Sequence, residues 1–357
     1  MERIGKISSF QMFSILFLSR IISLFTFMLP TAAYIPSGDR MLTSLIVFVF
    51  EIFYCLALIF TLRRTGNRGI INRAREKSEL LSRLLAVAYT LAFIWFAGIG
   101  TARFELFIST VMFPNSELYI MIILLLGASV YASLKGLEAI GRASVILFFL
   151  LGLSIIFILL TVTGEFRGEN LSPLFTEGIS PLLSFSFYVS VRASELLTLH
   201  VTAPDINGNI GRTAISFSAV FSLVSTVILI VLAGVTGEFG NDQIFPLYTL
   251  TVIAKFGIFE RLDDILTGVW VLCSFIQVSF LINTGMKALS QGFGKIKKIP
   301  VCLLITSGIF IIYILTSRTV SVFSEAVSSR AVDVIFTSLM LIIPLIVSFT
   351  VKKRAKV

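Results

Sequence analysis

The sequence predicts an all-α integral membrane protein with ten transmembrane helices, and three observations lead to this fold class. Of the 357 residues, 56% are hydrophobic and only 14% are charged, whereas about 25% of the residues in a soluble domain are charged. The mean hydropathy is +0.97. Apolar runs of about 20 residues, long enough to span a bilayer, recur along the whole chain. These runs do not alternate with a period of two, which argues against a β-barrel.

Ten apolar segments account for these runs, and we expect each to form one membrane-spanning helix. Their approximate limits are 10–35, 41–62, 84–111, 118–134, 141–162, 181–201, 213–235, 262–290, 299–317 and 332–351. We expect no cleavable signal peptide, because the first run is too long for the apolar region of one. The connection 236–261 contains apolar residues at helical spacing, which predicts an interfacial helix on the outer face.

The distribution of basic residues predicts that both termini face the cytoplasm. With the N-terminus placed inside, twenty of the 29 Lys and Arg residues fall in inner loops or tails and six in outer loops. Basic residues gather on the cytoplasmic side of membrane proteins. This rule accounts for the net charge of +9, so we expect no nucleic-acid partner.

The ten segments divide into two halves, approximately 10–162 and 181–351, within one transmembrane domain over residues 1–357. Because five is odd, the second half enters the membrane from the opposite side. That is the topology of an inverted repeat. No repeat of the residues themselves is visible, so this prediction rests on topology alone.

Four charged residues are predicted to lie deep in the membrane: Arg20, Glu51, Arg192 and Glu195. Along straight helices, Arg20 and Glu51 lie about 15 Å deep, and Arg192 and Glu195 about 16 and 21 Å deep. The hydrocarbon core is about 30 Å thick, and a charge near its centre costs at least ~2.5 kcal/mol. We therefore expect two ion pairs: Arg192 with Glu195 at i, i+3, and Arg20 with Glu51 across the bundle.

These charges have two interpretations. In the structural one, two internal ion pairs only fix the helix packing. In the functional one, they line a water-accessible cavity for a proton or for the charged ends of a zwitterionic ligand. The neighbouring Ser23, Ser186, Tyr188 and Ser190 favour the second, because hydroxyls satisfy backbone groups where a helix breaks. Transporters bind substrate at such broken helices. The lack of a central glycine in either segment argues against a break.

Two further groups of residues are candidates for a site, the first for ligand binding and the second for a gate. Trp270, Ser274 and Gln277 recur at spacings of four and three, so one helix face can present them together. Arg103 and Glu105 lie near the outer end of the third segment. They are candidates for a gate, although Arg103 alone could instead extend to the outer headgroups.

The remaining polar residues do not form a recognisable catalytic site. His200 is the single histidine and stands at the inner end of the sixth segment, where a role in proton transfer is a weak hypothesis. We expect Lys287 and Asp264 at the membrane interfaces, and the three cysteines to be buried singly. No P-loop, nucleophile elbow or metal-ligand motif is present, so we expect no enzymatic activity, metal or cofactor.

Three stretches resemble one protein family. ISSFQMFSILFLSRIISLFTFMLP (7–30) resembles the opening helix of the B subunits of bacterial spore germinant receptors. FPLYTLTVIAKFGIFERLDDILTGVW (245–270) resembles the most recognisable block of that family, with its Phe-Pro start, Glu-Arg-Leu-Asp and later Trp. SFSFYVSVRASELLTLHVTAPD (184–205) resembles the sixth helix of the family. The resemblance extends over essentially the whole chain and includes related proline and arginine permeases.

The resemblance implies a fold and a function. The family belongs to the amino acid–polyamine–organocation superfamily, with a five-plus-five inverted fold of the leucine-transporter type. It implies nutrient sensing in the inner membrane of a dormant spore, with a small-molecule germinant such as an amino acid, beside partner A and C subunits. By the resemblance, Glu195 matches the glutamate of the sixth helix, and Glu260, Arg261, Leu262 and Asp263 match the ERLD block.

The sequence leaves three functions open. The leading hypothesis is a germinant sensor that binds an amino acid between the first, third, sixth and eighth segments. We do not expect an arginine at positions 20 and 192 in every member of the family. Two buried guanidinium groups, of Arg20 and Arg192, favour an acidic or carboxylate-bearing ligand. The second hypothesis is an active permease, with Glu51 or Glu195 as proton carrier. The third is a structural subunit without a ligand of its own.

Overall fold

The computed structural model describes residues 6–25, 35–112, 119–254 and 263–350. The longer helices are α1 (Ser9–Phe25), α2 (Ser37–Thr65), α4 (Glu79–Phe107), α5 (Tyr119–Lys135), α6 (Leu137–Thr161), α7 (Ile179–Val191), α9 (Ile210–Thr236), α11 (Asp263–Phe293) and α12 (Lys298–Thr316). The shorter ones are α3 (Ile70–Arg75), α8 (Ser194–Thr202), α10 (Pro246–Ile253), α13 (Val320–Ser328), α14 (Arg330–Thr337) and α15 (Ile343–Thr350). Two π-helical turns, Ile108–Met112 and Ser338–Ile342, extend α4 and join α14 to α15.

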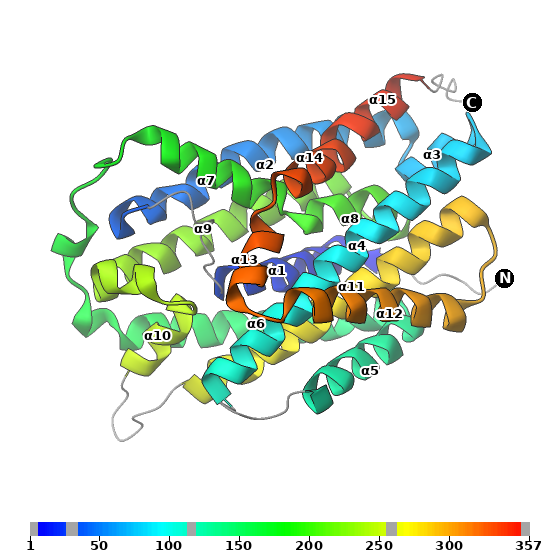
Figure 1. The fold of residues 1–357 in the computed structure, drawn as a ribbon. Coiled ribbons are helices and arrows are strands. Elements are labelled where there is room, and N and C mark those ends of the chain that lie inside the picture. Colours follow the sequence, from blue (N-terminus) through cyan, green and yellow to red (C-terminus); the bar gives the residue numbers. More distant parts are fainter. Residues whose placement is uncertain (1–5, 26–34, 113–118, 255–262, 351–357) are drawn as a thin grey trace.

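Most helices run side by side along one direction and form a single bundle (Figure 1). Among the described residues, eight helical stretches are long and apolar enough to cross a membrane: Ser37–Thr65, Glu79–Met112, Leu137–Thr161, Ile179–Asp205, Ile210–Asn241, Leu266–Phe293, Lys298–Thr316 and Arg330–Thr350. The first and fourth predicted segments form the shorter apolar helices α1 and α5. Large apolar side chains such as Ile123, Phe149 and Leu304 are exposed on the outside of the bundle, as expected of a surface that faces lipid.

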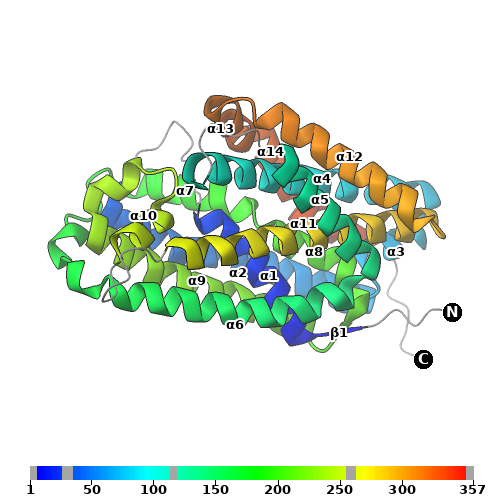
Figure 2. The ribbon, with the colours of Figure 1, turned by 90° about the horizontal axis from the view of Figure 1, so that it is seen from below.

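The two ends of the bundle carry different connections. Helix α3, the end of α15 and the start of α12 lie at one end, and α10 and the start of α7 lie at the other (Figures 1 and 2). The first group borders the loops predicted to be cytoplasmic. Helix α10 lies in the connection where we predicted an interfacial helix. Lys255 and Arg261 of that connection lie outside the described residues.

Helix boundaries follow local capping chemistry. The hydroxyl of Ser78 accepts a hydrogen bond from the backbone N–H of Leu81 at the start of α4, and the side chain of Asn209 accepts one from Arg212 at the start of α9. Both residue types are favoured at helix N-caps, because their side chains satisfy an unpaired N–H group. Helix α2 ends at Thr65 and is capped by Gly66, whose φ of 64° is a left-handed conformation that glycine adopts without strain.

The sixth segment is broken, contrary to the expectation from its lack of glycine. Helix α7 ends at Val191, and α8 begins at Ser194. Arginine side chains stabilise the break, because they donate to carbonyls in the last turn of α7. Arg192 Nη1 lies 2.9 Å from the oxygen of Tyr188, and Arg20 Nη2 lies 3.0 Å from that of Val189. Two guanidinium groups thus replace backbone donors at the negative end of a helix dipole.

Three close contacts fix how the elements around α1 and α4 pack. Strand β1 (Ile7–Ser8) pairs in parallel with β2 (Ile206–Asn207), which ties the start of α1 to the segment after α8 and adds a small sheet to the predicted all-α fold. Gly98 brings α4 against α12, where an added Cβ would lie 2.5 Å from Ile312 Cγ2. The neighbouring Gly100 faces Gln277 of α11 in the same way, at 2.6 Å from Gln277 Oε1.

Candidate functional site

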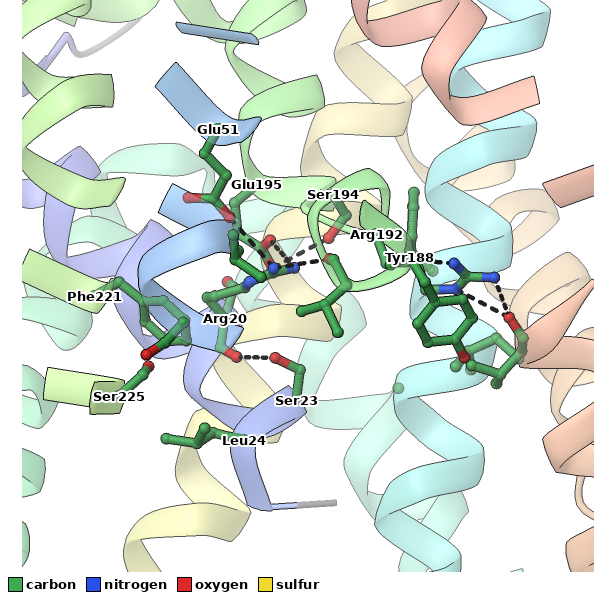
Figure 3. Close-up of a pocket in the computed structure, with 18 of the residues that line it drawn as sticks. Arg20, Ser23, Leu24, Glu51, Tyr188, Arg192, Ser194, Glu195, Phe221 and Ser225 are labelled. Atoms are coloured by element: carbon green, nitrogen blue, oxygen red, sulfur yellow. Dashed lines mark hydrogen bonds and ion pairs between the residues drawn. The ribbon is translucent and has the colours of Figure 1, made fainter. Parts of the chain in front are cut away.

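A cavity of about 130 Å³ lies at the break between α7 and α8. Its wall is built from α1, α2, α4, α7, α8, α9 and α11, with further residues from α13 and α14. Several buried or partly buried charges line it, from elements far apart in the sequence (Figure 3). The bundle therefore places a polar cavity inside apolar helices, at the position where one of those helices is interrupted.

One side of the cavity is formed by Arg20, Glu51 and Glu195, which we call the Arg20 cluster. Arg20 Nη2 lies 3.3 Å from Glu51 Oε1, and Arg20 Nη1 lies 3.8 Å from Glu195 Oε2. All three side chains are at most 3% exposed. Figure 3 shows both carboxylates directed at the same guanidinium group. One buried cation is thus shared by two buried carboxylates.

The opposite side holds the Arg192 pair, formed by Arg192 and Asp333. Arg192 Nη1 lies 2.5 Å from Asp333 Oδ1, and Arg192 Nε donates to the carbonyl of Val327 at 2.9 Å. Its guanidinium carbon lies 3.5 Å from the ring centre of Tyr188. The pair is more accessible than the Arg20 cluster, since the two side chains are 11% and 21% exposed. It connects the end of α7 to α13 and α14.

The predicted ion pair between Arg192 and Glu195 is not formed, and this corrects the sequence interpretation. That prediction assumed a continuous helix, in which residues three apart lie on one face. The chain leaves the helical conformation at Arg192 and Ala193, so the side chains on either side of the break point in different directions. Arg192 contacts Asp333, and Glu195 faces Arg20 instead. The predicted contact of Arg20 with Glu51 is confirmed.

Three further polar groups, Gln277, Ser194 and Arg103, also line the cavity. Gln277 donates from Nε2 to the carbonyl of Ser19 at 3.1 Å, while its Oε1 accepts no hydrogen bond from another described residue. Ser194 donates to Glu195 Oε1 at 3.1 Å. Arg103 of α4 also lines the cavity, so it is a wall residue and does not extend to the outer headgroups. The polar groups thus come from both sides of the α7–α8 break and from the helices that face it.

The family of proteins described as spore germination protein matches residues 6–322. The chain belongs to this family. Spore germination protein KB of Bacillus subtilis (strain 168) is 28% identical over 213 residues, which cover 57% of this chain and 56% of that protein. The matched region thus spans little more than half of that relative. As a member of the family with eight candidate spans, this spore germination protein is a multi-pass membrane protein.

Solved structures of transporters share the fold of this spore germination protein. Mhp1, a nucleobase-cation-symport-1 family transporter in a closed conformation with bromovinylhydantoin bound, matches with a TM-score of 0.63 at 13% identity, over 95% of this chain and 79% of Mhp1. A Na⁺-coupled sialic acid symporter in a substrate-bound outward-open state matches with a TM-score of 0.56 at 11% identity, over 94% of this chain and 76% of the symporter. A manganese transporter of Eremococcus coleocola matches with a TM-score of 0.51 at 13% identity, over 95% of this chain and 76% of that transporter.

Eight of the predicted site residues line the cavity of the spore germination protein: Arg20, Ser23, Glu51, Arg103, Tyr188, Arg192, Glu195 and Gln277. Five predicted site residues do not line the cavity: the binding candidates Ser186, Ser190, Trp270 and Ser274, and the gate candidate Glu105. The hydroxyls of Ser190 and Ser274 donate to carbonyls of their own helices, at 2.7 and 3.1 Å. The ring of Trp270 packs against those of Phe104 and Phe107, and its centre lies 5.8 Å from that of Phe104 and 4.2 Å from that of Phe107.

Sequence reasoning missed several parts of the wall. The aromatic residues Trp95, Phe96 and Phe336 line the cavity, but nothing distinguishes them in the sequence from other aromatic residues in apolar runs. Asp333 stands at the edge of the tenth predicted segment, where an acidic residue is ordinary. Of the ERLD block, residues 260–262 lie outside the described residues, and Asp263 begins α11.

The remaining candidates lie away from the cavity. Lys287 forms an ion pair with Asp205 and is mostly buried, 18% exposed, and its predicted position at a membrane interface stays a prediction. His200 is buried in α8, and its Nε2 lies 3.1 Å from the carbonyl oxygen of Met340. Asp264 is exposed, and the three cysteines are buried and free, as expected. Across the described residues, no three His, Cys, Asp or Glu side chains are placed to hold a metal ion.

Proposed function

We propose that this chain is the transporter-like B subunit of a spore germinant receptor, and that it binds an amino acid or similar small nutrient in the cavity at the α7–α8 break. The observation that carries the proposal is the set of buried charges around this cavity, next to an interrupted helix. The family match and the relative named for spore germination support the biological role. The transporter structures support a substrate-binding architecture.

The proposal includes a topology and a location. The two apolar helices α1 and α5 join the eight longer spans, which gives ten transmembrane helices in one domain over residues 1–357. Their halves, approximately 10–162 and 181–351, form an inverted repeat with both termini in the cytoplasm. The membrane is the spore inner membrane, and the partners are the A and C subunits of the receptor. Ligand binding shifts the population of cavity conformations, which the partners detect.

Spores that carry this chain as their sole B subunit test the proposal. Germination rate is measured against germinant concentration for the native chain and for Glu195→Gln. We expect at least a tenfold rise in the half-saturating concentration, because the variant removes a charge from the cavity wall. The control is Arg142→Gln, since that side chain is 73% exposed on α6, a helix that contributes no residue to the cavity wall. Unchanged dose and rate in Glu195→Gln, with equal receptor abundance, contradict the site.

A second function is favoured by one feature, the sharing of Arg20 between two carboxylates. One of Glu51 and Glu195 is left without a cation of its own, as a proton carrier requires. The corresponding proposal is a proton-coupled amino acid permease. Uptake of labelled amino acid into vesicles, driven by a pH gradient and abolished by Glu195→Gln, supports it. Binding of the amino acid without net uptake rejects transport and leaves the sensing role.

A further inference from the structure

Arg103 differs from the other two arginines in the cavity wall. Arg20 and Arg192 each contact a carboxylate. Arg103 forms no hydrogen bond or ion pair with another described residue, and its Nε is shielded from solvent. A guanidinium group held in a protein interior is costly unless an anion or an acceptor compensates it. The wall of the cavity thus carries one cation that has no hydrogen-bond or ion-pair partner in the described part of the chain.

The Arg20 cluster has the opposite imbalance. Arg20 is a single positive charge between Glu51 and Glu195, so one carboxylate is in excess. Glu195 is the one less well compensated, because its Oε2 lies 3.8 Å from Arg20 and accepts no hydrogen bond from the described residues. The cavity therefore presents on α4 a cation without an ion-pair partner among the described residues, and on α8 a carboxylate that Arg20 and Ser194 compensate only in part. No ion pair joins these two groups.

This arrangement selects the charge of a ligand. A neutral ligand compensates neither group, and a simple anion or amine compensates only one. A zwitterion compensates both, and it adds no net charge to a site surrounded by apolar helices. Gln277 Oε1, which accepts no hydrogen bond from a described residue, offers a second acceptor for an ammonium group. The planar guanidinium of arginine matches a carboxylate with two parallel hydrogen bonds.

The volume of the cavity limits the size of that ligand. An engineered apolar cavity of about 150 Å³ holds one benzene molecule, which has about six non-hydrogen atoms. The cavity of this chain, at about 130 Å³, is close to that size. An amino acid with a methyl side chain also has about six non-hydrogen atoms. Aromatic amino acids and nucleosides have more non-hydrogen atoms than a cavity of this volume holds by the same comparison.

We infer that the cavity binds a small α-amino acid in a fixed direction, with its carboxylate on Arg103 and its ammonium group toward Glu195. The inference rests on the proposed function, because it specifies the ligand of that same cavity. It gives α4 a role in recognition, beside the interrupted α7–α8 segment. It also explains why a third arginine is placed where the described residues provide no ion-pair partner for it.

Calorimetric binding to the purified protein with four probes tests this direction: alanine, alaninamide, propionate and ethylamine. We expect alanine to bind, and each probe that lacks one charged end to bind at least tenfold more weakly. In Arg103→Gln we expect the preference for alanine over alaninamide to fall below twofold. Arg103→Lys retains the charge without the paired donors, so alanine binds more weakly while the preference remains. The control Arg142→Gln leaves all four affinities unchanged.

Different outcomes overturn different claims. If the native protein binds alaninamide as tightly as alanine, the carboxylate is not recognised and the inference is wrong, while the cavity remains a binding site. The inference is also wrong if Arg103→Gln still prefers alanine over alaninamide as strongly as the native protein does. If Arg103→Gln does not fold, Arg103→Lys and the native probe series decide. If no probe binds the native protein, alone or with its partner subunits, alanine is rejected as the ligand, and the inference falls with the proposed function.

Discussion

The two sides of the cavity use arginine in different ways. In the Arg20 cluster, one guanidinium group is shared by two carboxylates, and all three side chains are at most 3% exposed. In the Arg192 pair, one guanidinium meets one carboxylate, with 11% and 21% exposure, and also bonds to the carbonyl of Val327. The shared cation leaves a charge for a ligand to compensate. The one-to-one pair leaves none, and it connects α7 to α14 at the more accessible side.

The largest effect is expected for Arg20→Met, which removes the cation of the shared cluster. Two carboxylates then face each other in the interior, and breaking a buried ion pair costs about 3–5 kcal/mol. Thermal unfolding in detergent measures the loss. Adding Glu51→Gln and Glu195→Gln to the same chain is expected to restore much of the stability. A loss below about 1 kcal/mol for the single variant contradicts the buried cluster, since that is the effect of an exposed pair.

The two carboxylates of the cluster are expected to separate stability from binding. Glu51 receives a hydrogen bond from Arg20 at 3.3 Å, so Glu51→Gln costs about 1.5–3 kcal/mol of unfolding free energy. Glu195 lies farther from Arg20, at 3.8 Å. Glu195→Gln is therefore less destabilising, but it weakens ligand binding at least tenfold, about 1.4 kcal/mol. Thermal unfolding and calorimetry of both variants make this comparison, and equal effects on both properties contradict it.

Disrupting the Arg192 pair is expected to change the rate at which bound amino acid dissociates more than it changes the stability of the protein. Asp333→Asn removes a charge from a partly exposed pair, which costs about 1 kcal/mol of unfolding free energy. Without that contact α14 is held less firmly against α7, so we expect bound amino acid to dissociate several-fold faster. Stopped-flow dissociation measures the rate. An unchanged rate means that the pair does not control access to the cavity.

The smallest effect is expected from a single methyl group at the cavity wall. In Gly100→Ala the new Cβ would lie 2.6 Å from Gln277 Oε1, so the end of the Gln277 side chain must move. We expect a loss of binding of a few-fold with little change in stability, since the displaced atom ends a flexible side chain. Gly127→Ala on α5 is the control, because nothing lies within 4 Å of an added Cβ there. Equal affinity in the two variants excludes Gln277 from the site.

The sequence was a good guide wherever a residue type carried the information. Charges in apolar runs predicted the cavity, because burial of Arg20, Glu51 and Glu195 is costly unless they meet. Sequence reasoning failed where the course of the backbone determined which side chains meet. The spacing of Arg192 and Glu195 predicted a pair, but the break turns the two side chains apart. For Arg103 the sequence left a gate and a contact with the outer headgroups open, and the structure places its side chain in the cavity wall.

The break itself shows why local signals were insufficient. Glycine was the expected sign of an interrupted helix, yet the interruption at Arg192 has none. Its carbonyls are satisfied by arginine side chains, one of which comes from α1, 169 residues away in sequence from Val189. Asp333 likewise became a partner only through the tertiary fold. Contacts of this kind depend on which helices are neighbours, which a single sequence does not specify.

The most direct test of a ligand cavity is the thermal stability of the purified protein, alone and with its partner subunits, against amino acids, sugars and nucleosides. A ligand at 100 times its dissociation constant adds about 2.7 kcal/mol to the free energy of unfolding. We predict stabilisation by small amino acids only, lost in Glu195→Gln and kept in Arg142→Gln. No stabilisation by any compound in either preparation, or the same stabilisation in Glu195→Gln, contradicts a ligand site and favours charges that only pack helices.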